Sequence, residues 1–287
     1  MTPPPFERIA IIGLGLIGGS VALAARRRWP TLDITACDPA PITAEAVTQG
    51  LVQRLAEPEA LPPVDLIVIA TPVQTVPGIL TTLARTHTRA VVTDVSSTKR
   101  VVMAAAKETG LTFVGGHPVA GAEHGGLASA RADLFDGKAW LLVSPQAAPA
   151  TATEPVDDPV HEAMLTTFVT ELGARPSWTD AVTHDKVMAH VSHAPQVIST
   201  ALMAASAEAV GPEGVAWSGK GFADMTRLAS SPSEIWQGIL DTNADFIADA
   251  LQALAAKLPT SSEALMDAPS VKALFERARA LREGRTR

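Results

Sequence analysis

The stretch of sequence that decides the fold is GLGLIGGS, residues Gly13–Ser20, near the N-terminus. It follows the short apolar run Arg8–Ile12 and overlaps the alanine-rich segment Leu16–Arg28, which ends in three arginines. An apolar run that stops at a glycine predicts a buried β-strand, and terminal arginines suit the negative end of a helix dipole. The order of strand, glycine turn and helix is the pattern that opens a dinucleotide-binding βαβ unit.

Each glycine of this loop has its own physical reason in such a unit. Gly13 allows the tight turn, Gly15 lets the backbone approach a pyrophosphate, and Gly18 permits close packing of the helix on the strand. Leu16 and Ile17 open the predicted helix, whose N-terminal amides and partial positive charge favour phosphate. A glycine-rich turn that binds no ligand is the competing interpretation.

Asp38 stands at the end of the second predicted strand, Asp33–Cys37, and 20 residues after Gly18. A carboxylate at this place accepts hydrogen bonds from the ribose hydroxyls of adenosine and repels a 2′-phosphate, so NAD is favoured over NADP. No arginine directly follows Asp38 to rescue a 2′-phosphate. Because a proline comes next, a simple turn role for Asp38 stays open.

Strand-like and helix-like segments continue to alternate through the first half of the chain. The further predicted strands are Asp65–Ala70, Arg89–Thr93, Thr112–Val114, Ala139–Val143 and Arg175–Trp178. Continuous apolar runs of this kind fit strands buried on both faces of a parallel sheet. From Thr183 onward the periodicity is almost only helical, with a break at Gly211-Pro212. We therefore predict an α/β fold: a doubly wound Rossmann-type domain over residues 1–180, followed by an all-helical domain over residues 181–287.

The composition narrows the classes of function. The 287 residues are 47% hydrophobic and 18% charged, which is enough apolar material for a sizeable core. With 23 basic and 30 acidic residues the net charge is −7, which disfavours nucleic acid as the main partner. The single cysteine, Cys37, cannot form a disulfide within the chain, and no apolar run approaches the ~18 residues of a membrane span. No signal-peptide pattern opens the chain, so we expect a cytoplasmic protein that does not bind membranes.

Three loops follow predicted strands at the edge of the sheet where doubly wound folds bind ligands. They are Thr71-Pro72-Val73, residues 93–99 (TDVSSTK) and the glycine-rich residues 115–126 (GGHPVAGAEHGG). We expect His117 to lie on the third loop and to take a proton from a substrate hydroxyl as hydride leaves the same carbon. A hydrogen bond that anchors the loop is the competing role for His117. The hydroxyls of residues 96–98 either serve catalysis or cap the helix that follows them.

The start of the helical half carries His184, His190, His193 and Gln196. The spacing of three residues puts the last three on one helix face. We expect some of these four side chains to line a pocket and others to cap a helix or lie on the surface. No carboxylate at ligand spacing accompanies them, so we expect no metal site. Arg227 follows a segment rich in glycine and suits bidentate binding of a carboxylate, with an ordinary surface ion pair as the alternative.

Together these motifs resemble the prephenate/arogenate (cyclohexadienyl) dehydrogenase family of tyrosine biosynthesis. The match extends from about Arg8 to Asn243, and its most specific parts are GGHPVAG at 115–121 and DMTRLASS at 224–231. The resemblance implies NAD-dependent oxidative decarboxylation of prephenate to 4-hydroxyphenylpyruvate, CO2 and NADH. It leaves open whether arogenate is also converted, to tyrosine. It further implies a homodimer joined through the helical domain.

The same resemblance implies roles for single residues. His117 polarises or deprotonates the ring hydroxyl, and Ser97 forms a hydrogen bond near that hydroxyl. Arg227 holds a substrate carboxylate, and His193 belongs to a segment that faces the pocket. Further candidate contacts are Ser96, Glu123 and Gln196 for the substrate, and Thr71 and Pro72 for the cofactor.

The sequence departs from the family pattern at two places. Many members carry a second histidine three residues after His193, where this chain has Gln196, so the preference between prephenate and arogenate stays open. Ala223 replaces a basic residue that many members carry, and Lys220 is a candidate substitute. Three other functions also stay open: a 4-amino-4-deoxyprephenate dehydrogenase of a secondary-metabolite pathway, a β-hydroxyacid dehydrogenase, and a non-catalytic NAD-binding sensor.

Overall fold

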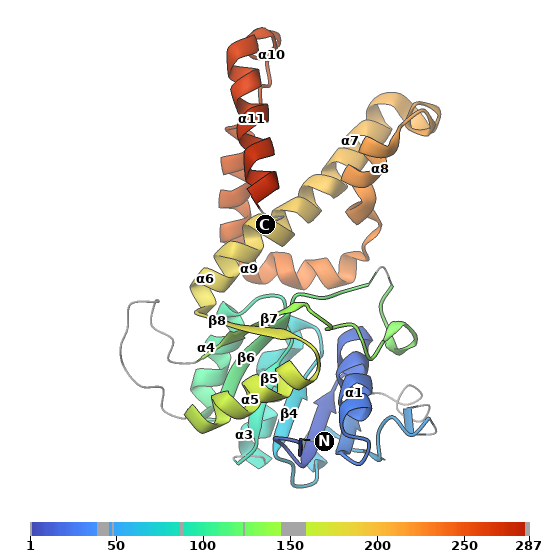
Figure 1. Cartoon of the computed structure of the whole chain (residues 1–287), viewed down its shortest axis with the longest axis vertical. Coiled ribbons are helices and arrows are strands. Elements are labelled where there is room, and N and C mark those ends of the chain that lie inside the picture. The colour runs from blue at the N-terminus through green and yellow to red at the C-terminus, as the bar shows by residue number, and fades with distance from the viewer. Residues whose placement is uncertain are drawn as a thin grey trace.

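The computed structural model describes residues 2–38, 46–47, 49–86, 89–122, 124–144 and 159–284. A sheet with helices on both faces forms the first half, and helices follow it in the second half (Figure 1). The strands are β1 (Arg8–Ile12), β2 (Asp33–Cys37), β3 (Arg54–Leu55), β4 (Leu66–Ile69), β5 (Val91–Asp94), β6 (Phe113–Pro118), β7 (Ala139–Val143) and β8 (Arg175–Thr179). The helices are α1 (Leu16–Arg28), α3 (Val76–Thr86), α4 (Arg100–Thr109), α5 (Pro159–Glu171), α6 (Ala181–Met188), α7 (Ala194–Ala216), α8 (Lys220–Thr226), α9 (Ser233–Ala255), α10 (Ser262–Met266) and α11 (Ala268–Gly284).

The strand order of the sheet is β3-β2-β1-β4-β5-β6-β7-β8. All neighbouring strands are parallel except β6 and β7, which are antiparallel. The chain adds strands on one side of β1 up to β3 and then crosses to the other side at β4. Open α/β sheets bind ligands at such a switch point, outside the carboxyl ends of the strands. The predicted doubly wound fold class is confirmed.

Two hydrophobic cores lie on opposite faces of the sheet because alternate strand residues point to opposite sides. Ile9 and Ile11 of β1 belong to the core that α1 and α5 cover. Ala10 and Ile12, their neighbours in the same strand, belong to the core that α3 and α4 cover. The first core also contains stacked aromatic rings of Trp29 and Phe168. Helices therefore cover both faces of the sheet, and a ligand can bind at the edge formed by the strand ends.

Strand β6 is longer than the sequence predicts. Residues 115–118 (GGHP) extend it, and they pair with residues 140–143 of β7 in antiparallel register. Glycine and proline disfavour strands on their own, so this extension depends on the partner strand. The expectation that His117 lies on a loop is wrong, since it pairs with Leu141 inside the sheet.

Among the described residues of the helical half, a small buried core is formed by Ala189, Ala194, Ile247 and Ala250. Helices α7 and α8 form one arm, and α10 and α11 belong to a second arm that diverges from it (Figure 1). Large apolar side chains on these arms are exposed, Trp217 by 87% and Phe275 by 72%. Within the described residues, no helix is long and apolar enough to cross a bilayer.

Candidate active site

The glycine loop joins β1 to α1 at the switch point of the sheet. Gly13 has φ of +98°, and a Cβ there would lie 2.6 Å from the carbonyl oxygen of Ala70. A Cβ at Gly18 would lie 1.9 Å from the carbonyl oxygen of Gly13. The packing of the protein therefore requires glycine at both places. At Gly15, in contrast, no protein atom lies within 4 Å of the Cβ position, so the close approach of a ligand is what would require glycine there.

The groups around this loop fit a dinucleotide. Helix α1 begins after Gly15 without a side-chain cap and without an acidic residue in its first turn, so the first-turn amides, those of Leu16 and Ile17 included, favour an anion. The amide of Leu14 donates to Asp38 Oδ2 at 2.6 Å, which holds this carboxylate against the loop. Thr71 lies against Gly13, and Pro72 follows it.

A buried ion pair fixes the carboxyl ends of β5 and β6 relative to each other. The ammonium of Lys99 pairs with Asp94 and donates to the carbonyl of Gly116 at 2.7 Å, and neither charged side chain is exposed. The amide of Gly116 donates back to Asp94 Oδ1 at 2.9 Å. Burial lowers the pKa of Lys99, and the nearby carboxylate of Asp94 opposes that shift. Because buried charges need partners, this pair fixes Gly116 in β6 and thereby positions the neighbouring His117 of the same strand.

His117 begins a chain of buried hydrogen bonds that crosses from the sheet to the helices. Its Nδ1 lies 2.8 Å from Nε2 of His184, and Nδ1 of His184 lies 2.8 Å from Oδ1 of Asp185. Burial lowers the pKa of His117 well below its ordinary value, and the neighbouring His184, Lys99 and His193 lower it further. His117 is therefore a neutral imidazole at neutral pH and can accept a proton.

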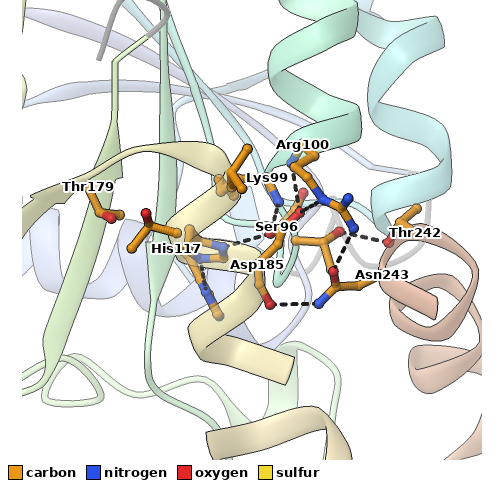
Figure 2. A network of polar contacts seen from close by, with 12 residues as sticks. Ser96, Lys99, Arg100, His117, Thr179, Asp185, Thr242 and Asn243 are labelled. Carbon is orange, nitrogen blue, oxygen red and sulfur yellow. Dashed lines mark hydrogen bonds and ion pairs between the residues drawn. The ribbon is translucent and has the colours of Figure 1, made fainter. Parts of the chain in front are cut away.

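Asp185 caps helix α4 from the other half of the molecule. Its carboxylate accepts from the amide of Lys99 at 2.7 Å and from the amide of Arg100 at 2.9 Å. Capping by the hydroxyls of residues 96–98 is not observed, since α4 has no side-chain cap from its own N-terminal segment. Figure 2 shows Lys99, Arg100, His117 and Asp185 gathered in this network, which the sequence alone did not identify.

The hydroxyls of Ser96 and Ser97 do not cap α4, and they lie at the edge of this network. Ser96 is buried, and its Oγ has no hydrogen-bond partner among the described residues. Ser97 beside it is half-buried. Both serines remain candidate ligand contacts. Glu123, the third candidate from the loops after the strands, lies outside the described residues.

The segment Ala189–His193 between α6 and α7 is a π-helical turn. It places His190 on a different side of the helix from His193 and Gln196. His193 and Gln196 are buried, but His190 is exposed and its Nδ1 binds the carbonyl of Lys186. The expectation that His190 shares a face with the other two is wrong because a π-turn changes the angular spacing of three residues.

Gln196 anchors the segment that carries Arg227. Its Nε2 donates to the carbonyl of Leu228 at 2.7 Å, and its Oε1 accepts from the hydroxyl of Ser231 at 3.3 Å. Arg227 begins the short 3-10 helix Arg227–Ser230 and has an exposed side chain. In this structure the amide of Gln196 is thus engaged within the protein. Among the described residues, no three His, Cys, Asp or Glu side chains are arranged to hold a metal ion.

The fold and the site define a nucleotide-binding protein of the dehydrogenase type, with a Rossmann-type half and a helical half. Residues 21–165 match a family model described as prephenate dehydrogenase, nucleotide-binding domain, and residues 180–276 match one described as prephenate dehydrogenase, dimerization domain. The chain belongs to the prephenate dehydrogenase family, and the resemblance found in the sequence is confirmed.

Individual relatives agree with this assignment. The chain is 26% identical to the prephenate dehydrogenase of Lactococcus lactis, over 96% of the chain and 77% of that protein. It superimposes with a TM-score of 0.84 on a prephenate dehydrogenase from A. aeolicus solved with hydroxyphenyl propionate and NAD+, at 25% identity and over 100% and 98% of the two chains. For the arogenate dehydrogenase of Synechocystis the TM-score is 0.79 at 25% identity, over 96% and 99% of the two chains.

The buried histidines predict how the stability of the protein depends on pH. Burial lowers the pKa of His117 and His184, and it lowers that of His193 to about 4. Between pH 7 and pH 5 the unfolded chain therefore binds more protons than the folded one. As the pH is lowered from 7 to 5, the free energy of unfolding falls by up to about 1.4 kcal/mol per pH unit for each histidine. Urea denaturation over this range should show the fall, and His193→Gln should make it shallower. Constant stability from pH 7 to pH 5 would contradict the burial of these rings.

Proposed function

We propose that this protein catalyses the NAD-dependent oxidative decarboxylation of prephenate to 4-hydroxyphenylpyruvate, CO2 and NADH. The observation that carries the proposal is the neutral, buried His117 at the edge of the sheet onto which the glycine loop also opens. The hydroxyphenyl propionate and NAD+ bound to the A. aeolicus relative support it, because that ligand has the phenol and the side-chain carboxylate of the expected product.

The residues around the glycine loop would hold NAD. Gly13, Gly15 and Gly18 shape the loop for a pyrophosphate, and the amides of Leu16 and Ile17 face its charge. The carboxylate of Asp38 would bind the adenosine ribose, and Thr71 and Pro72 would contact the dinucleotide from β4. When bound, NAD supplies the hydride acceptor of the reaction.

His117 would act as the acceptor, and later the donor, of the ring hydroxyl proton. It accepts this proton as hydride leaves the carbon that bears the hydroxyl, so a carbonyl forms at that carbon. The ring carboxylate then leaves as CO2, its bonding electrons make the ring aromatic, and the proton returns to the oxygen to give a phenol. Ser97 would hydrogen-bond near the same oxygen. Decarboxylation makes the step effectively irreversible.

The helical half would hold the substrate. The exposed guanidinium of Arg227 suits a substrate carboxylate, and His193 would face the pocket. Gln196 would act on the substrate through its hold on the Arg227 segment, and Ser96 and Glu123 are further candidate contacts. We propose residues 1–180 as the nucleotide-binding domain and residues 181–287 as the dimerisation and substrate domain, the first ending one residue after β8.

The proposed homodimer would cover the apolar side chains that the helical arms expose. A small core within one chain and strongly exposed Trp217, Met266 and Phe275 are what an interface between copies requires. The family model described as a dimerization domain covers residues 180–276 and supports this.

Turnover assays test the proposed reaction directly. Nicotinamide reduction should be followed with NAD and with NADP, with prephenate, arogenate and the 4-amino analogue offered separately. We expect turnover with prephenate and NAD. His117→Asn should lower kcat by about 10²–10⁴-fold because the proton acceptor is lost. The exposed His190→Asn is the matched control and should not change kcat. NAD binding without turnover of any of these substrates would favour the sensor, and turnover of the amino analogue alone would favour that enzyme.

Gly15→Ala tests the cofactor site. The added methyl group meets no protein atom, so the melting temperature should hold, but it would obstruct the pyrophosphate and raise the Kd for NAD by about tenfold or more. Calorimetric titration with NAD measures this. Gly78→Ala in α3 is the control, because its methyl group also meets no atom and Gly78 belongs to a helix and not to the glycine loop. Equal affinities in the two variants would place the dinucleotide elsewhere.

The dimer is tested by light scattering on the full chain. We expect twice the mass of one chain. Replacing Met266 and Phe275 together by glutamate should shift the protein toward monomer, because each charge would be buried in an apolar interface. The same substitution at exposed Val160 in α5 should leave the dimer intact. A wild-type monomer at micromolar concentration would contradict the proposed assembly.

A further inference from the structure

One arginine determines how the amide of Asn243 is oriented. Nη2 of Arg100 lies 2.9 Å from Oδ1 of Asn243. A guanidinium can only donate hydrogen bonds, so the amide oxygen must face Arg100 and the amide nitrogen must face away from it. That nitrogen lies 2.9 Å from the carbonyl oxygen of Asp185 and 3.2 Å from Nδ1 of His193. Asn243 therefore donates to both.

The orientation of Asn243 in turn determines where the proton of His193 lies. Burial lowers the pKa of His193 to about 4, so the ring is neutral and carries one N–H. Since its Nδ1 accepts from Asn243, the proton is on Nε2. His193 therefore presents an N–H donor on the side of the ring that Asn243 does not occupy.

Asp185 determines the opposite arrangement for His117. Burial alone would raise the pKa of Asp185, but hydrogen bonds from His184 and from the amides of Arg100 and Lys99 lower it, so the group is an acceptor. His184 must then donate through Nδ1 and accept through Nε2. His117 donates its Nδ1 proton to that nitrogen, so Nε2 of His117 carries a lone pair.

We infer that Arg100, Asp185 and Asn243, here called the clasp, are positioning residues that hold His117 and His193 in opposite tautomers. His117 is held as an acceptor at Nε2 and His193 as a donor at Nε2. The catalytic role of the two tautomers rests on the proposed function. In that reaction, Nε2 of His117 takes the proton of the ring hydroxyl, and the N–H of His193 binds an oxygen of the substrate. Figure 2 shows the clasp beside His117.

Local irregularities in the helices bring the clasp and His193 together. Helix α9 is kinked at Asn243, whose φ of −141° and ψ of 22° are not helical, and the π-turn ends at His193. Both side chains are buried. π-turns inside helices are frequent at functional sites, which fits a positioning role for this region.

Two isosteric variants test the inference. In Asp185→Asn, the amide oxygen stays with Arg100 at the Oδ2 position, so the new NH2 takes the Oδ1 position. There it faces Nδ1 of His184 and reverses the tautomers of His184 and His117, and the amide of Lys99 loses its acceptor. We expect kcat to fall by about 10²–10⁴-fold, with the KM for NAD unchanged. In Asn243→Asp, the new carboxylate accepts from Nδ1 of His193 and reverses that ring alone. We expect the KM for prephenate to rise by about tenfold, with a smaller change in kcat.

The tautomers themselves are read by NMR on the full chain with 15N-labelled histidine. Long-range 1H–15N spectra distinguish protonated from bare ring nitrogens, and His117→Asn and His193→Asn assign two of the seven histidines. We expect a bare Nε2 in His117, a bare Nδ1 in His193, and the reversals described for the two variants. The control is Asp245→Asn, which removes an exposed partner of Arg100 outside the clasp and should change neither ring.

The spectra separate this inference from the proposed function. Wild-type rings with the opposite protons, or variant rings that do not reverse in either variant, would overturn the inference even if prephenate is turned over. If the tautomers and their reversals are as expected but prephenate is not converted, the inference about the clasp holds and the proposed reaction fails. A variant that does not fold is replaced by the other, since each reverses a different ring.

Discussion

The buried carboxylate of Asp185 is the interaction on which the site depends. A charge without exposure to water is costly unless hydrogen bonds replace its hydration. Here they come from the amides of Lys99 and Arg100 at the N-terminus of α4 and from the ring of His184. Because α4 belongs to the sheet half and Asp185 to the helical half, one charge caps a helix, joins the two halves and ends the hydrogen-bond chain from His117.

Arg100 extends this junction into α9. Beyond Asp185 it reaches Asn243 and the carboxylate of Asp245, and its guanidinium lies 4.2 Å from the ring centroid of Phe246. The helical half has few buried side chains of its own, so its placement against the sheet relies on polar contacts of this kind. The two ends of the site, the glycine loop and the histidines, are thus held in place by different forces. The glycine loop is fixed by close backbone packing and by Leu14, which is buried in the apolar core, whereas buried charge fixes the histidines.

Helices and strands that are determined by residues close together in the sequence were predicted correctly from the local pattern of apolar residues and glycines. Strand β1, helix α1 and strand β2 lie within the predicted bounds because their apolar runs and glycine turn are contiguous. The extension of β6 was not predictable in this way, since glycine and proline form a strand there only by pairing with β7. The shared helix face of His190, His193 and Gln196 was predicted wrongly because a π-turn cannot be distinguished from an α-turn by spacing alone.

The sequence by itself determined the family, the nucleotide-binding glycine loop and the candidate proton acceptor, His117. These depend on short motifs whose residues act together within one turn or strand. Only the tertiary structure decided which groups control that histidine. His117 and His184 are 67 residues apart, and His193 and Asn243 are 50 apart. Hydrogen bonds between such distant residues form only when sheet and helices pack, so no local pattern records which ring nitrogen carries the proton.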